Sequence, residues 1–97
     1  MCDKKNKIEN EDIKSIRENI DSLDEDIAYL LLKRLYLVKE IGKIKKNNNL
    51  KILDIKREKK KFQDLKHFTK DKREESYLLN IYKKIMDESK IAENYYA

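Results

Sequence analysis

The feature that most limits the possible folds is a heptad pattern of apolar residues between positions 13 and 44. Such a pattern predicts one long amphipathic helix, and the chain has no proline and only one glycine, Gly42, to interrupt it. At 1.5 Å per residue this helix would be about 50 Å long, which is too long for a compact monomer of 97 residues. The two rows of the pattern are Ile13, Ile20, Ile27 and Ile41, and Ile16, Leu23, Leu30, Leu37 and Ile44.

Two shorter helices are predicted after the long one. The triplet Asn47 to Asn49 should end the first helix, because asparagine tolerates the left-handed conformation of a helix cap. A second helix is expected from about Leu50 to His67, and a third after Asp71, which has Glu74 three residues on, close to a capping box. The side chains expected to face the core are Ile52, Ile55, Phe62, Leu65, Leu78, Ile81, Tyr82, Ile85 and Met86.

Composition excludes several classes of protein. With one cysteine, Cys2, the chain has no intramolecular disulfide, and a functional thiol at this terminal position is not expected. No apolar run reaches the roughly 18 residues of a membrane span, and the N-terminus has no signal-peptide core. A cytoplasmic protein is therefore expected. Its net charge of +5 favours anionic partners.

Polar residues occupy positions on the apolar faces of all three predicted helices. Arg34, for example, stands where the row through Ile27 and Ile41 should hold an apolar residue. Any one such residue is most simply a chance seam charge that snorkels or pairs in the core. As a set, four cations, three acids and a serine suit a pocket for a small dianion better than a self-neutralising core. The set is Arg17, Arg34, Lys45, Asp54, Arg57, Glu58, Ser89 and Glu93.

The spacing of the two arginines in the first helix favours a dimer. Arg17 and Arg34 would lie roughly 25 Å apart on a straight helix, so they cannot hold the same small molecule within one chain. If two copies pair antiparallel about a two-fold axis near Ala28, Arg17 of one copy lies between Arg34 and Lys45 of the other. The expected fold is therefore a single all-α domain over residues 1–97 in an intertwined homodimer. Its first helix starts near Asn10, and residues 1–10 are expected to be disordered.

Five short segments occur in an order and at separations that resemble one known family. They are IRENIDSLD at 16–24, KR at 33–34, EIGKIK at 40–45, DIKRE at 54–58 and DES at 87–89. Together they resemble the all-helical class of chorismate mutase, and the likeness covers about residues 13–94. The resemblance implies a three-helix protomer in an intertwined homodimer that converts chorismate to prephenate on the route to phenylalanine and tyrosine. This isomerisation needs no metal or cofactor, in agreement with the lack of Cys/His clusters and glycine-rich loops.

The resemblance also implies a role for each cation of the first helix and for one acid. Arg17 would come from the partner chain and Arg34 from the same chain, and both would hold substrate carboxylates. Lys45 would meet a carboxylate and the ether oxygen of the substrate. Glu58 would be the main acceptor for the ring hydroxyl, which explains a carboxylate where leucine would otherwise complete the apolar stripe.

Four further residues receive roles in the same way. Asp54 would lie near the ring hydroxyl, Arg57 would accompany it at the site, and Ser89 would assist carboxylate binding. Glu93 stands where a glutamine often faces the ether oxygen in bacterial members. It can help only when protonated, because an ionised carboxylate would repel the negative charge that develops there.

Two other functions stay open at this point. A lyase of the same fold removes pyruvate from isochorismate by a related pericyclic step, and fold-level likeness does not separate the two enzymes. A basic helical dimer that binds RNA or DNA would explain the charge of +5 and the run Lys59 to Lys61. It would not explain Glu58, Ser89 and Glu93 on apolar faces. We therefore expect a small-molecule enzyme with no nucleic-acid or membrane partner.

Overall fold

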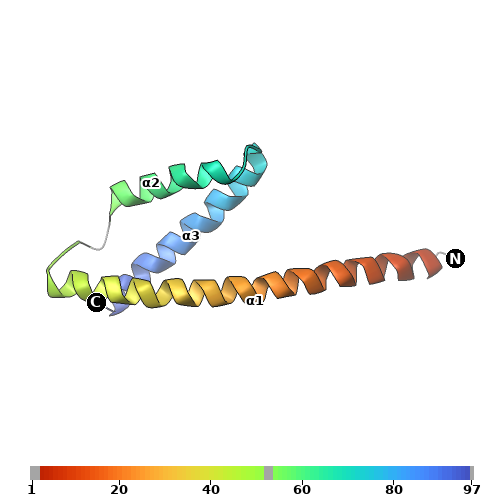
Figure 1. Cartoon of the computed structure of the whole chain (residues 1–97), viewed down its shortest axis with the longest axis horizontal. Coiled ribbons are helices and arrows are strands. Elements are labelled where there is room, and N and C mark those ends of the chain that lie inside the picture. The colour runs from red at the N-terminus through yellow and green to blue at the C-terminus, as the bar shows by residue number, and fades with distance from the viewer. Residues whose placement is uncertain (1–2, 52–53, 97) are drawn as a thin grey trace. The chain divides into compact units, whose positions relative to one another are not determined.

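A computed structural model of the chain describes residues 3–51 and 54–96. Within these residues there are three α-helices, one short 3₁₀ helix and no strand (Figure 1). Their order is α1 (Asp3–Asn47), α2 (Ile55–Leu65), η1 (Lys66–Phe68) and α3 (Lys72–Tyr96). The predicted all-α class with a long first helix is confirmed. The chain divides into two compact units, Met1–Arg34 and Leu35–Ala97, which are described in turn.

The first unit contains the N-terminal part of α1. Every side chain from Asn10 to Lys33 is exposed, including the apolar residues of the heptad rows. The helix begins at Asp3, so the predicted start near Asn10 was wrong. Residues 3–9 contain no proline or glycine that would stop a helix, and several are good helix formers. Disorder of residues 1–10 stays a prediction, and Cys2 lies outside the described residues.

The second unit has a small core between the end of α1, α2 and α3. Its buried apolar side chains among the described residues are Val38, Leu65 and Met86. Two residues predicted to face the core are exposed instead, Ile55 at 54% and Ile81 at 41%, because a single chain of this size has too little core to cover them. Ile52 lies outside the described residues. The remaining predicted core residues, Phe62, Leu78, Tyr82 and Ile85, are half-buried.

The end of α1 is fixed by its asparagines. Asn49 has a φ of 55°, in the left-handed region. The amide of Leu50 donates to the carbonyl of Lys45 at 2.8 Å, and the amide of Asn49 donates to that of Lys46 at 3.3 Å. These are the two hydrogen bonds of a Schellman motif. The predicted stop at Asn47 to Asn49 is confirmed, and it places Lys45 in the last turn of the helix.

The start of α2 differs from the prediction. The helix begins at Ile55 rather than near Leu50, because Asp54 acts as its N-cap in an extended conformation with φ −123° and ψ 90°. The Oδ1 atom of Asp54 accepts a hydrogen bond from the amide of Arg57 at 3.0 Å. The predicted start therefore missed a cap that the sequence contains.

The start of α3 confirms the role predicted for Asp71. Its Oδ1 atom accepts hydrogen bonds from the amides of Arg73 at 2.8 Å and Glu74 at 3.1 Å. The Glu74 side chain accepts from the Thr69 hydroxyl at 2.8 Å, and that hydroxyl accepts from the Asp71 amide at 3.1 Å. Thr69 thus relays the contact that a simple capping box would make directly.

The last turn of α3 is held against α1 by a cation–π contact. The Lys39 ammonium lies 4.2 Å from the centre of the Tyr96 ring and 5.4 Å from that of Tyr36. Tyr95 meets Tyr96 edge to face at 4.8 Å but is itself mostly exposed. The contact between Lys39 and Tyr96 fixes the end of the helix that carries Glu93.

Among the residues that the structure describes, none of the helices has an apolar stretch of the length needed to cross a membrane.

Candidate active site

Lys45 and Glu93 form an ion pair between the last turn of α1 and the end of α3. The Nζ atom of Lys45 lies 3.6 Å from Oε1 of Glu93. The side chains are only 18% and 11% exposed, so water screens this pair less than a surface pair. Both residues were predicted to belong to the site, from segments far apart in the sequence. The structure brings them together.

Gly42 allows the two helices to approach closely enough for this pair to form. It lies one turn before Lys45 and is buried against the backbone of α3. A Cβ atom at this position would lie 2.7 Å from the carbonyl oxygen of Glu93 and 3.2 Å from its Cα. Because those atoms are backbone, a side chain at position 42 would force the helices apart.

Replacing Gly42 with alanine is expected to destabilise the protein by about 1–3 kcal/mol, because the added methyl group overpacks the contact. In an exposed helix the same change would stabilise by about 1 kcal/mol. Urea unfolding measures the difference. Lys43→Ala, at the exposed neighbouring position, is the control and should change stability by less than about 0.5 kcal/mol. A Gly42→Ala variant as stable as this control would contradict the close approach.

A second charged cluster joins α2 to α3. Lys90 lies 3.0 Å from Oε1 of Glu58 and 3.4 Å from Oδ1 of Asp87. The Lys90 and Glu58 side chains are both partly covered, at 34% and 25% exposed. The hydrogen bond from the Lys90 ammonium to Glu58 raises the pKa of Lys90, and the carboxylate charges add to the effect. Glu58, predicted to point inward, is therefore half-buried and already paired.

Asp54 and Arg57 were predicted to point inward, but both are exposed in this chain. The cap contact accounts for Asp54, whose carboxylate turns back to its own helix. Ser89 is half-buried, and its hydroxyl donates to the carbonyl of Ile85 at 2.7 Å. The roles of these three residues toward a substrate stay predictions.

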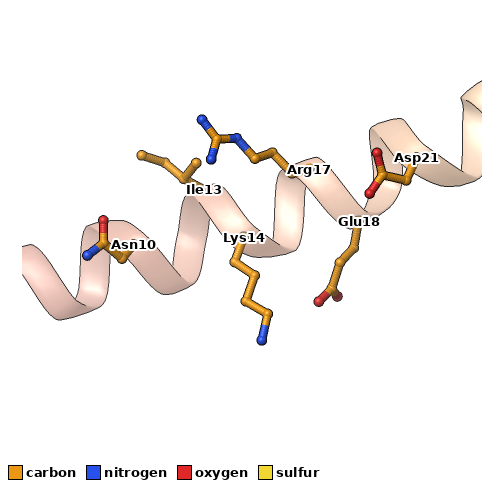
Figure 2. A pocket seen from close by; sticks show the side chains of 6 residues that line it. All are labelled: Asn10, Ile13, Lys14, Arg17, Glu18 and Asp21. Atoms are coloured by element: carbon orange, nitrogen blue, oxygen red, sulfur yellow. The ribbon is translucent and has the colours of Figure 1, made fainter.

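Arg17 and Arg34 belong to the first unit. Figure 2 shows Arg17 on the same side of α1 as Ile13, with Lys14 and Glu18 on the other side. Arg17 helps to line a surface hollow whose walls come from consecutive turns of α1, and its side chain is exposed. Arg34 is half-buried. Arg17 is thus exposed in the single chain, and its supply to a partner chain stays a prediction.

Sequence reasoning missed Lys90, the residue with which Glu58 pairs. A lysine that follows Asp87 by three residues is an ordinary helix-surface pattern, so only the packing of α2 on α3 reveals its partner. In the part of the chain that the structure describes, no group of His, Cys, Asp and Glu side chains could hold a metal ion.

These observations define an all-α protein in which α3 forms one lysine–carboxylate pair with α1 and another with α2. Comparison with known proteins gives the family. The model of the family described as chorismate mutase type II matches residues 16–94. The chain therefore belongs to the chorismate mutase type II family, and the resemblance seen in the sequence is confirmed.

Two curated relatives share its sequence. The bifunctional chorismate mutase/prephenate dehydratase of Aquifex aeolicus (strain VF5) is 39% identical over 61 residues, which cover 63% of this chain and 17% of the relative. That of Buchnera aphidicola subsp. Schizaphis graminum (strain Sg) is 35% identical over 79 residues, covering 80% and 20%. The chain thus spans at most a fifth of the length of these relatives. No solved structure matches the chain significantly.

Proposed function

We propose that this protein rearranges chorismate to prephenate on the route to phenylalanine and tyrosine, in the cytoplasm and with no nucleic-acid or membrane partner, and that residues 1–97 form one helical domain that does so. The observation that carries the proposal is the Lys45–Glu93 pair, which brings together the two residues expected at the ether oxygen. Family membership over residues 16–94 supports it. The relatives of Aquifex and Buchnera bear chorismate mutase in their names.

The working form is, on this proposal, a homodimer. Every residue of the two heptad rows is exposed, by 38% to 61%, in the single chain. A contiguous apolar stripe of this extent is not left in water by a stable protein. A second copy paired antiparallel through the same stripe would cover it, and would bring its Arg17 toward Arg34 and Lys45 as the sequence spacing requires.

Binding would select the reactive shape of the substrate. Arg17 of one copy and Arg34 of the other hold the two carboxylates, with Ser89 assisting and Arg57 and Asp54 nearby. Because both carboxylates are bound, the flexible enolpyruvyl arm stays over the ring, where the new carbon–carbon bond forms. Glu58 accepts the hydrogen bond of the ring hydroxyl. No covalent intermediate is required, because the rearrangement is unimolecular.

Catalysis would come from charge at the ether oxygen. As the carbon–oxygen bond breaks, negative charge grows on this oxygen, and a fixed Lys45 ammonium stabilises it more in the transition state than in the ground state. The close approach at Gly42 holds the last turn of α1, which carries Lys45, against α3 before substrate arrives. Preorganised charge of this kind costs no rearrangement during the reaction.

Replacing Glu93 with glutamine is expected to raise kcat. The Glu93 carboxylate would repel the negative charge that develops on the ether oxygen, whereas a glutamine amide can donate a hydrogen bond to it. We expect the variant to exceed the wild type by about tenfold in kcat. The measurement is kcat for chorismate. Glu88→Gln, on the exposed side of α3, is the control and should leave kcat within about twofold of the wild type. A Glu93→Gln variant with the kcat of the wild type would reject the role of Glu93.

The direct test of the function adds chorismate to the purified protein and follows its absorbance while prephenate is identified among the products. Turnover to prephenate is expected. Isochorismate is supplied in parallel, since release of pyruvate from it would instead identify the lyase of the same fold. Salt-dependent binding of RNA or DNA without turnover would support the nucleic-acid alternative.

A further inference from the structure

The Lys90 side chain lies where it can act on the proposed acceptor of the substrate hydroxyl. Its ammonium contacts Oε1 of Glu58 at 3.0 Å, across the α2–α3 interface. Asp87, one turn earlier on α3, holds the ammonium from the other side at 3.4 Å. Lys90 is thereby fixed between two carboxylates, one from each helix.

Lys90 offsets the negative charge of Glu58, which would otherwise weaken binding of a dianionic substrate. A carboxylate is a strong acceptor for a hydroxyl, but it repels a substrate that carries two negative charges. An ammonium hydrogen-bonded to one carboxylate oxygen offsets this repulsion and leaves the second oxygen able to accept. The pair also restricts the rotamers of Glu58, because it ties the carboxylate to α3.

We propose that Lys90 is a positioning residue of the active site, which orients Glu58 toward the ring hydroxyl and offsets its charge against the dianionic substrate. The inference rests on the proposed chorismate mutase function. It extends that function by adding a residue from the α2–α3 interface that contacts Glu58 and need not contact the substrate. The effect should appear in substrate binding more than in the chemical step, because the ether oxygen lies with Lys45.

The chain offers a matched control on the same helix. Lys84 pairs with Glu88 on the same helix at 3.7 Å, and both side chains are largely exposed, at 76% and 61%. Lys90→Met and Lys84→Met remove the same charge and keep a similar stem. We expect Lys90→Met to raise KM for chorismate about fivefold, with kcat changed less than about twofold, and Lys84→Met to change neither. Lys90→Arg should restore most of the loss, since it can pair with Glu58.

A double-mutant cycle separates this role from simple support of the fold. If Lys90 acts through Glu58, Lys90→Met should raise KM no further in a Glu58→Gln background. An equal rise in both backgrounds would overturn the proposal. So would a Lys90→Met enzyme that matches Lys84→Met. If Lys90→Met does not fold, Asp87→Asn is tested in its place, because it removes a carboxylate that holds Lys90. Asp87→Asn should also raise KM, and an unchanged KM would contradict the role of Lys90.

Turnover by the wild-type enzyme separates a failure of the proposed function from a failure of the role of Lys90. Wild-type enzyme that turns over chorismate, with Lys90→Met equal to the control, removes the inference alone. Wild-type enzyme without turnover removes the proposed function and the inference with it. A wild-type enzyme that is active and responds only at Lys90 supports both.

Discussion

Replacing Lys45 with methionine is expected to lower kcat by a factor of about 10² to 10³, because Lys45 is proposed to be a preorganised donor to the developing oxyanion. Methionine keeps the length and much of the volume of the lysine stem, so the packing of α1 on α3 near Gly42 should survive. The measurement is kcat and KM for chorismate under saturating conditions. In free-energy terms, the loss is about 3–4 kcal/mol of transition-state stabilisation.

Lys43→Met is the control for this experiment. Lys43 is exposed and lies two residues away on the same helix, so its replacement alters the net charge equally without touching Glu93. We expect it to leave kcat within about twofold of the wild type. If both variants lose activity alike, the effect is one of general charge, and Lys45 does not contact the reacting oxygen.

The elements that sequence predicted well were those set by local signals. The heptad pattern gave the long first helix, and Asn49 adopts the left-handed conformation expected at its end. Asp71 caps α3 as predicted. The predicted start of α2 was wrong although its signal, the N-cap residue Asp54, is local. A residue can belong to a cap and a site at once, and periodicity alone does not decide between them.

Local sequence signals predict which residues of the candidate site face inward but not which residues they pair with. Lys45, Glu58 and Glu93 were predicted to face inward, and each is partly or largely buried in the structure, while their roles toward a substrate stay predictions. Their partners depend on which helices pack together, which a pattern along one helix cannot show. Lys90 was missed for this reason, and the close approach at Gly42 appears only when α3 is placed beside α1. Asp54 and Arg57 were predicted to point inward but are exposed, because a position beside an apolar stripe is not necessarily covered by another helix.

Mixing two inactive variants should restore activity if the site is shared between chains. Arg17→Ala and Arg34→Ala are each expected to lose more than about 10³ in kcat/KM, because each removes a cation that is proposed to hold a substrate carboxylate. In a mixed dimer, one site receives an intact Arg34 from one chain and an intact Arg17 from the other. The second site carries both defects and stays inactive.

The size of the recovery follows from the symmetry. When equal amounts of the two chains are unfolded together and refolded, random pairing makes about half of the dimers mixed, and each mixed dimer has one working site of two. Activity should therefore return to about a quarter of the wild-type value. Refolding Arg34→Ala with Lys45→Met is the matched control. Both of these residues are proposed to serve the site of their own chain, so no mixed dimer gains a complete site. Recovery in both mixtures, or in neither once mixed dimers are demonstrated, is incompatible with an Arg17 supplied by the second copy. Recovery confined to the Arg17 mixture would also explain why α1 presents an uncovered apolar stripe and an exposed arginine along the same helix.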